Sequence, residues 1–374
     1  MPSTQLRQEV LRRARRLVIK VGSQLLTREG GGADTAFMRR IAGQIGDLLD
    51  AGYEITLVSS GSISVGCQAL DLARRPKDIG RLQAVAAVGQ SGLMNGWHAS
   101  FRRQGLAAAQ MLLTRDDFQD RGRYLNISNC LSALHQIGAV PVVNENDTVS
   151  VDEISLGDND ILAALVTNAI CADALVLLTV VDGLHDERKQ LLDLVEDPAT
   201  ARNLVATGRS PWGSGGMQTK LEAARMVTEA GEIAVVANGR ERNVLKRIAE
   251  GEKLGTIFVP AKRKLAARQR WIGHAVRPSG QITVDAGAAQ AVVQKHKSLL
   301  ATGIVEVVGR FAKGDVVVVR NEDGREIARG LINFDCDETR KIMGKKSSQF
   351  AGLLHHGTYQ EVIHRDHLVV TTGS

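Results

Sequence analysis

Short apolar runs alternate with helical patterns through the first two-thirds of the chain. Runs rich in Val, Ile and Leu predict buried strands at 16–21, 54–60, 107–113, 139–143, 174–179 and 232–237. Apolar residues at helical spacing predict helices at 36–51, 81–103, 124–136, 160–169 and 217–230. Near-continuous apolar strands separated by helices indicate a mostly parallel sheet covered on both faces. The expected fold class is therefore α/β, a three-layer sandwich with a mostly parallel central sheet.

The pattern changes after about Pro260. From Gly280 onward the apolar strands are short and separated by turns, and Asn321 to Arg325 holds an Asp-Gly pair between alternating residues, which is a hairpin signal. We therefore expect a separate, small β-rich domain at the C-terminal end. The predicted organisation is a basic N-terminal extension at 1–15, a first domain at 16–260, a basic linker at 261–278, a β-rich domain at 279–360 and a tail at 361–374.

The net charge of +6 is concentrated in two short segments. Residues 1–17 carry five arginines against one glutamate, and residues 262–270 carry five cationic side chains and no acid. The rest of the chain is net negative, which excludes a broad basic surface for nucleic acid. Aromatic residues make up only 3% of the chain, so stacking platforms for single strands are also hard to build. For residues 1–17, a solvated leading helix is favoured over a transit peptide.

No apolar run approaches the ~20 residues that span a bilayer. The four cysteines form no CxxC pair, so no zinc, redox or disulfide framework is indicated. We expect a cytoplasmic protein.

Two candidate ligand-binding turns follow the first two strands. Lys20 lies within an apolar strand, where its charge is costly unless it is used, and Gly22 lets backbone N–H groups approach a ligand closely. A lysine whose stem reaches the surface is the alternative. Ser60 and Gly61 belong to a small, hydroxyl-rich turn that suits an anion at a helix start, or an ordinary N-cap.

Two polar clusters follow. The run from Asn144 to Asp147 comes after an apolar strand and can bind a polar substrate or cap a turn. Asp158, Asn159 and Asp160 open a predicted helix. Two carboxylates around an amide exceed what an N-cap requires; they can hold a metal, orient lysines or bind an ammonium group. The alternative is a charged first turn favoured by the helix dipole.

A glycine-rich turn from Gly213 to Lys220 opens the last helix of the first domain. Such a turn with a following lysine is typical of a phosphate cradle. It is not a Walker A motif, because Thr219 stands where that motif has glycine. Motifs of Rossmann dehydrogenases, GxSxG hydrolases, zincins and protein kinases are absent from the sequence.

Taken together, these motifs indicate phosphoryl transfer. Two lysines on separate loops, two anion-binding turns and one acidic cluster are the parts that neutralise and position a transferring phosphoryl group. The residues alone therefore predict a small-molecule kinase with a metal–nucleotide donor.

Seven segments in this order resemble the glutamate 5-kinases of the amino-acid kinase family: VIKVGSQLLT, LVSSGSISVG, AVGQSGLM, AQMLLTRDDF, VPVVNENDTVS, GDNDILAALV and GSGGMQTKLEAARM. The C-terminal part resembles a PUA domain. The resemblance implies the amino-acid kinase fold and ATP-dependent phosphorylation of the L-glutamate γ-carboxylate to L-glutamyl 5-phosphate, the first step of proline biosynthesis. It also implies Mg²⁺ bound mainly through the nucleotide, feedback inhibition by proline, a homodimer or homotetramer, and transient contact with glutamyl phosphate reductase.

The resemblance also assigns roles. Lys20 and Lys220 match the family lysines that stabilise the transferring phosphoryl group, and Asp160 matches the acid that orients them. Substrate-binding positions are expected at Ser60, Gly61, Asn144, Asp147, Asp158 and Asn159. Nucleotide-binding positions are expected at Lys20, Gly22, Thr179, Val180, Ser214, Gly215, Gly216, Met217, Gln218, Thr219 and Lys220. No residue is expected to bind the metal directly.

One position departs from the family pattern, and other functions stay open. Many relatives carry an acidic or amide residue where this chain has Val180, so contact with the nucleotide there falls to the backbone, and Asp182 lies close by. The alternatives are a kinase of the same fold that acts on another carboxylate, a carbamate or a nucleoside monophosphate, or an RNA-binding regulator that uses the PUA domain.

Overall fold

The computed structural model describes residues 3–28, 32–150, 158–196, 215–260, 266–354 and 360–371. The chain divides into two compact units, residues 1–264 and 265–374. Each unit has its own apolar core.

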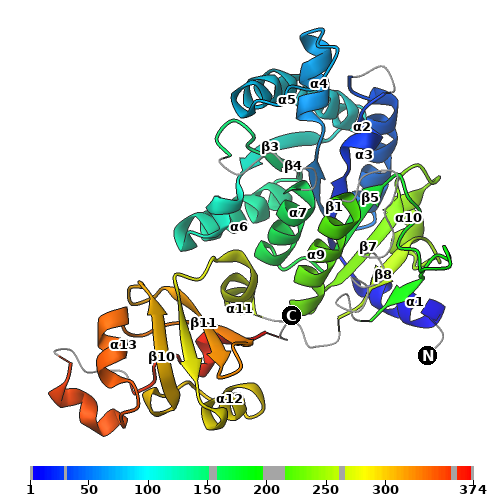
Figure 1. The fold of residues 1–374 in the computed structure, drawn as a ribbon. Coiled ribbons are helices and arrows are strands. Elements are labelled where there is room, and N and C mark those ends of the chain that lie inside the picture. Colours follow the sequence, from blue (N-terminus) through cyan, green and yellow to red (C-terminus); the bar gives the residue numbers. More distant parts are fainter. Residues whose placement is uncertain are drawn as a thin grey trace. The chain divides into compact units, whose positions relative to one another are not determined.

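Eight strands of the described residues form one sheet in the first unit, in the order β3-β4-β2-β1-β5-β7-β8-β6 (Figure 1). They are β1 (Arg16–Val21), β2 (Glu54–Ser59), β3 (Ala107–Leu113), β4 (Ala139–Glu145), β5 (Ala174–Thr179), β6 (Leu194–Val195), β7 (Ile233–Asn238) and β8 (Thr256–Phe258). Neighbouring strands are parallel except for the antiparallel pair β7 and β8. The expected mostly parallel α/β sheet is confirmed.

Helices cover both faces of this sheet. The helices are α1 (Ser3–Arg13), α2 (Ser23–Leu26), α3 (Thr35–Asp50), α4 (Ser62–Ala69), α5 (Ile79–Arg102), α6 (Arg121–Gln136), α7 (Asp158–Ala169), α9 (Gly215–Glu229) and α10 (Val244–Ala249), with a 3₁₀ turn at η1 (Arg115–Phe118). One core cluster joins apolar residues of α3, α5 and α10 to one face of the sheet. Helices α6, α7 and α9 contact the strands from the other face.

Side-chain alternation along the strands sorts residues between these two faces. In β1, Leu17, Ile19 and Val21 belong to the cluster with α3 and α5. Because successive strand residues point to opposite faces, Lys20 is directed to the α7 face. In β4, Val140 and Val142 belong to the same cluster, so Asn144 is directed to the α5 face.

Two features of the first unit differ from the sequence expectations. Strand β4 continues through Asn144 and Glu145, which pair with Leu112 and Leu113 of β3, so these two polar residues end the strand rather than follow it. Helix α1 is present, but it is not solvated on all sides. Arg7 is fully buried, and its guanidinium donates hydrogen bonds to four backbone carbonyls, at Asp193, Glu252, Leu254 and Gly255.

The second unit holds a five-stranded mixed sheet in the order β10-β9-β11-β12-β13. Its strands are β9 (Gly280–Val284), β10 (Ile304–Gly309), β11 (Val316–Asn321), β12 (Glu326–Leu331) and β13 (Leu368–Val370). Its helices are α11 (Ala267–Arg270), η2 (Trp271–Ala275), α12 (Ala286–Val293), η3 (Ala301–Gly303), α13 (Cys336–Ile342), η4 (Ser347–Gly352) and η5 (Arg365–His367). The predicted hairpin is present: β11 and β12 pair antiparallel around Gly324, whose φ of 78° favours glycine.

Most of each segment expected to flank the β-rich domain, residues 265–278 and 361–371, belongs to this unit. In the expected linker, Trp271 and Ile272 are buried. In the expected tail, Val362 and Ile363 join the core, and β13 pairs with β12. Their apolar side chains explain the difference, because they gain stability only when packed.

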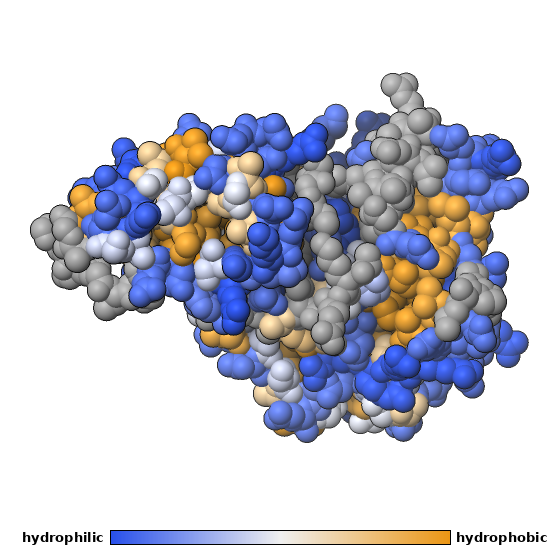
Figure 2. Space-filling model, turned by 90° about the horizontal axis from the view of Figure 1, so that it is seen from below, coloured by the Kyte–Doolittle hydropathy of each residue, from blue (hydrophilic) through white to orange (hydrophobic). Residues whose placement is uncertain are grey.

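The surface is mixed. Figure 2 shows polar residues over much of one face, with apolar residues gathered in patches between them. Within the described residues, no helix is both long and apolar enough to cross a membrane.

Candidate active site

Four neighbouring strands bring their carboxyl ends to one edge of the first sheet. In the order β4, β2, β1 and β5 they are all parallel, and Val21 is in register with Ser59 on one side and Leu178 on the other. Gly22, Ser60 and Thr179, each one residue further on, therefore lie along this edge. In open parallel sheets, ligands bind at this edge.

At this edge Lys20 meets a carboxylate of α7. The Lys20 side chain is only 6% exposed, so it does not reach the surface, and its Nζ lies 2.6 Å from Oδ1 of Asp160. Asp160 is in the first turn of α7 and is fully buried. The strand lysine thus has a charge partner.

The second lysine contacts the other oxygen of the same carboxylate. Lys220 Nζ lies 3.0 Å from Oδ2 of Asp160, and the hydroxyl of Thr219 donates to that oxygen at 2.9 Å. Lys220 also donates to the Gly216 carbonyl one turn earlier in α9. Asp160 therefore bridges β1 and α9.

Burial and charge act in opposite directions on this cluster. Burial raises the pKa of Asp160, but the charges of Lys20 and Lys220 outweigh it and leave the pKa lowered, so the carboxylate stays ionised. Burial lowers the pKa of Lys220, and Lys20 adds to this effect while Asp160 opposes it. With both lysines charged, the cluster carries one net positive charge at the sheet edge.

The glycine-rich positions lie beside this cluster. Gly22 follows β1, and its N–H donates to the Leu178 carbonyl, so its own N–H is already paired. A β-carbon at Gly22 would lie 3.4 Å from that carbonyl oxygen, which limits the space for a side chain. Helix α9 begins at Gly215 and includes Met217 and the exposed Gln218. Ser214 and the side chain of Asp158 lie outside the described residues.

A second group of predicted residues surrounds the turn after β2. Gly61 has φ 105°, a left-handed conformation that favours glycine, and it precedes the first residue of α4. Ser62 donates to Oδ2 of Asp147 at 2.8 Å, and both residues are buried. Ser60 is buried as well. The turn after β2 and the turn after β4 are thus held together.

Two side-chain amides complete this end of the site. The amide of Asn144 donates from Nδ2 to Oε1 of Gln90 on α5, at 2.7 Å. Oδ1 of Asn159, on α7, accepts from the backbone N–H of Glu145 at 3.3 Å. The polar end of β4 is therefore fixed to α5 on one face of the sheet and to α7 on the other.

The predicted nucleotide positions after β5 stand apart from the lysine cluster among the described contacts. The Thr179 carbonyl accepts from the Gly239 N–H at 2.8 Å, which joins the ends of β5 and β7. The side chain of Val180 packs against the apolar core. Asp182 accepts from Asn238 at 2.9 Å. Because the Val180 side chain has no polar atom, a hydrogen bond to a ligand at this position would come from its backbone.

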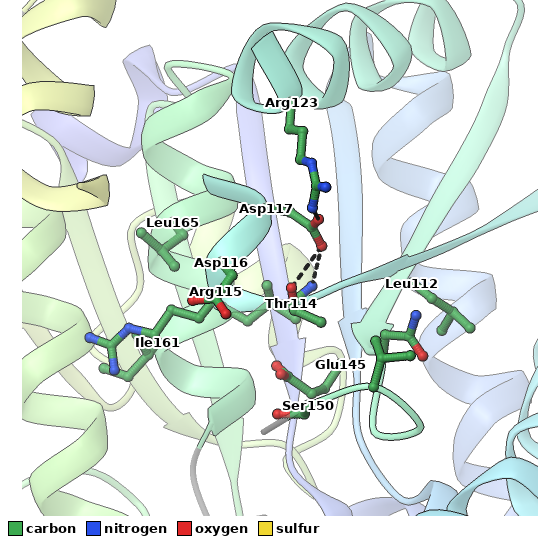
Figure 3. A pocket seen from close by; sticks show the side chains of 13 residues that line it. Leu112, Thr114, Arg115, Asp116, Asp117, Arg123, Glu145, Ser150, Ile161 and Leu165 are labelled. Carbon is green, nitrogen blue, oxygen red and sulfur yellow. Dashed lines mark hydrogen bonds and ion pairs between the residues drawn. The ribbon is translucent and has the colours of Figure 1, made fainter. Parts of the chain in front are cut away.

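A pocket of about 380 Å³ opens beside the turn after β4 (Figure 3). It lies between the ends of β3 and β4, η1 and α7, and Glu145 and Asn146 of the turn line it. On its far wall, Asp117 accepts from the Thr114 hydroxyl and pairs with Arg123. The pocket is therefore lined by residues of the turn after β4, and neither lysine of the cluster lines it.

The acid of the cluster is not free to bind a metal. Each oxygen of Asp160 is already in contact with an ammonium group. Among the described residues, no group of three or more His, Cys, Asp or Glu could hold a metal ion. Asp160 is therefore not the residue that would hold a metal ion.

Sequence reasoning did not single out Gln90, and it included Ser62 only as part of the hydroxyl-rich turn at 59–62. Both lie inside segments that carried the resemblance, SSGS and AVGQ, so the signal was their place in those segments. Residue type alone gave no signal for either residue, because a serine at a helix start and a glutamine within a helix are common.

Family comparisons cover both units. The amino acid kinase family matches residues 15–238, and the PUA domain matches residues 280–354.

Individual relatives match almost the whole chain. A glutamate 5-kinase from Caldanaerobacter subterraneus subsp. tengcongensis is 44% identical over 95% of this chain and 97% of its own. Others from Thioalkalivibrio sulfidiphilus and Halorhodospira halophila are 45% and 46% identical over 98% of this chain; the matches cover 100% and 99% of those chains. Among solved structures, N-acetylglutamate synthase from Neisseria gonorrhoeae is similar in fold, with a TM-score of 0.52, 15% identity, and coverage of 70% of this chain and 63% of that one.

Proposed function

The chain belongs to the amino acid kinase family and, within it, to the glutamate 5-kinases, and we propose that its site works by in-line phosphoryl transfer between two lysines. The reaction is ATP-dependent phosphorylation of the γ-carboxylate of L-glutamate, the first step of proline biosynthesis. The observation that carries the site assignment is the buried Asp160 carboxylate in contact with Lys20 on one oxygen and Lys220 on the other.

The chemistry needs charge neutralisation rather than a base. An ionised carboxylate is already a nucleophile, so the difficulty is to bring it close to a polyphosphate. An ammonium group has three N–H donors. Each lysine therefore keeps a donor for phosphoryl oxygens after its contact with Asp160. Asp160 acts as a positioning residue that fixes both ammonium groups before the substrates arrive.

The two substrates bind at opposite ends of the sheet edge. On the β2 and β4 side, Ser60, Gly61, Asn144, Asp147 and Asn159 surround the amino acid, and Asp147 is the anionic partner for its ammonium group. On the β5 and α9 side, the glycine-rich turn and the backbone after Thr179 bind ATP. Asp158 and Ser214 stay assigned to these two sides by resemblance alone.

Mg²⁺ enters with ATP and is held mainly through its phosphates. When bound, the ion neutralises phosphate charge and orients the transferring group. The residues of this chain then supply the remaining positive charge through Lys20 and Lys220.

Regulation and assembly follow the resemblance. We propose that proline inhibits the enzyme, that the chain forms a homo-oligomer, and that glutamyl phosphate passes by transient contact to its reductase. Proline titration, mass measurement in solution and co-sedimentation with the reductase test these three points.

The decisive experiment measures ADP release by the purified chain with Mg²⁺ and ATP, and with hydroxylamine present to trap an acyl phosphate. L-Glutamate, aspartate, N-acetylglutamate, carbamate and UMP are supplied separately. Glutamate-dependent ADP release with a hydroxamate product is expected. Turnover of another member of this panel, with none of glutamate, would overturn the substrate assignment.

A further inference from the structure

The amide pair formed by Asn144 and Gln90 has unused hydrogen-bonding capacity. Asn144 is 2% exposed, and its Nδ2 donates to Oε1 of Gln90. Its own Oδ1 is buried with no hydrogen-bond partner. The Gln90 NH₂ group likewise has no partner among the described residues. A buried unsatisfied polar atom costs about 1–3 kcal/mol, so this arrangement calls for an explanation.

The residues on either side of Gln90 contact the turn after β2 and the start of α4. A β-carbon on the adjacent Gly89 would lie 1.8 Å from the Ser62 carbonyl oxygen, so α5 touches the start of α4 with no side chain between them. One turn further, Leu93 packs near Gly61, at 3.9 Å from the position of a β-carbon there. Gln90 therefore belongs to the stretch of α5 that runs past this turn, and its amide meets the end of β4.

The pair has a defined polarity. Asn144 donates to Oε1, and in this arrangement the N–H groups of Gln90 are left for a ligand. Gln90 is partly exposed, whereas Asn144 behind it is buried. Oδ1 of Asn144 stays without a hydrogen-bond partner in this arrangement.

We propose that Gln90 is a specificity-determining residue whose amide N–H groups, oriented by Asn144, bind the α-carboxylate of the amino-acid substrate. The inference rests on the proposed function of the same site. The γ-carboxylate of L-glutamate faces the lysine cluster and Asp147 takes the ammonium group, which leaves the α-carboxylate in need of donors. A neutral amide supplies them without a further cation near the phosphoryl group.

The test separates the substrate groups with two analogues. Glutarate lacks the ammonium group, and 4-aminobutyrate lacks the α-carboxylate. For Gln90→Leu, kcat/KM should fall about ten- to hundredfold with L-glutamate, mainly through KM, because a hydrogen bond to a charged group is lost. The kcat/KM for glutarate should fall by a similar factor, and the kcat/KM for 4-aminobutyrate should not change. Where turnover of an analogue is too slow, its constant as a competitive inhibitor replaces kcat/KM.

A second variant reverses the charge relation. Gln90→Glu should weaken the binding of L-glutamate more than Gln90→Leu does, because the two carboxylates repel each other. The binding of 4-aminobutyrate, which lacks the α-carboxylate, should stay the same or improve. Asn95→Leu, an exposed amide on the same helix, is the matched control and should change none of the three substrates.

Three outcomes would overturn the proposal. An equal loss with all three compounds would make Gln90 a structural residue. A loss with L-glutamate and 4-aminobutyrate but not glutarate would show that the pair binds the ammonium group. Unchanged kinetics in Gln90→Leu would rule out a role of Gln90 in substrate recognition, while activity of the wild-type chain on L-glutamate would still support the proposed function. If the wild-type chain were inactive on L-glutamate, the proposed function and the role of Gln90 would both be overturned.

Discussion

At the scale of residues, the proposed mechanism depends on a single buried carboxylate shared by two lysines. Removing either ammonium group takes away positive charge where the transferring phosphoryl group is negative. We expect Lys20→Ala and Lys220→Ala each to lower kcat by about 10²–10³-fold or more. Steady-state kinetics check this.

The fold should survive both changes, because the remaining lysine still neutralises Asp160. Circular dichroism and the thermal midpoint test this point. Lys246→Ala serves as the control, since Lys246 is on α10 and its side chain is 62% exposed. Turnover near the wild-type value in either site variant contradicts the assignment.

The lowered pKa of Lys220 predicts a pH dependence. Because burial lowers this pKa, Lys220 loses its proton at a lower pH than an ordinary lysine, whose pKa is ~10.4. Activity should therefore fall as the pH rises through the pKa of Lys220. The opposing contribution of Asp160 raises the pKa of Lys220. In Asp160→Asn, the alkaline fall in the residual activity should therefore move to lower pH.

The measurement is kcat/KM for ATP at saturating L-glutamate, followed across the alkaline range. An alkaline fall at the same pH in wild type and Asp160→Asn would show that another group controls it.

Residue type and pattern predicted some of these side chains and missed others for physical reasons. Lys20 stood out because a charge in an apolar strand needs a partner, and that partner is Asp160. Arg7 did not stand out, because it sits in an arginine-rich run whose members look alike until α1 packs and buries one of them. Gln90 gave no signal, because its proposed role depends on a contact between α5 and β4 that local sequence does not encode.

At the scale of elements, Arg7 links α1 to backbone carbonyls of the first unit, in addition to the packing of Leu11 in the core. Arg7 pairs with Asp193 and donates to carbonyls around Gly255, and burial lowers its pKa, with Asp193 opposing. Removing it leaves buried carbonyls unpaired, so we expect Arg7→Met to lower the free energy of unfolding by about 2–5 kcal/mol. Arg13→Met is the control, because that side chain is 79% exposed, and it should change stability by under about 0.5 kcal/mol. Chemical denaturation distinguishes the two; equal effects would refute the buried role.

The contact between α4 and α5 depends on glycine. A β-carbon at Gly89 would lie 1.8 Å from the Ser62 carbonyl oxygen and 2.4 Å from the Gly66 backbone nitrogen. Gly89→Ala should therefore force the helices apart, destabilise the fold by about 1–3 kcal/mol and raise KM for L-glutamate by displacing Ser62. Gly80→Ala, in the first turn of α5, meets nothing closer than 3.5 Å and should not destabilise. Thermal melts with glutamate kinetics measure both, and a Gly89→Ala protein with normal KM contradicts the expectation.

Element types were predictable where apolar periodicity was strong, as in β1 and α9, while their ends depended on pairing. Strand β4 extends to Glu145 because β3 continues beside it, and that partner is not visible in the local sequence. The expected tail became β13 because β12 offered an edge for it.

At the scale of the whole molecule, the chemistry and the second unit are separable. Every described residue assigned to the site lies between Lys20 and Lys220, within the first unit, and the core of that unit draws on none of the residues from 265 onward. The PUA domain has its own core and its own sheet. A chain ending at residue 264 should therefore fold and phosphorylate L-glutamate with kcat within a few-fold of the full chain. Hydroxamate formation measures the activity, and proline titration of both chains shows whether inhibition needs the second unit. A truncated chain whose circular dichroism shows that it is folded, but which lacks activity, would mean that the PUA domain supplies part of the site. The assignment of the whole reaction to the first unit, argued from the two separate cores, would then be wrong.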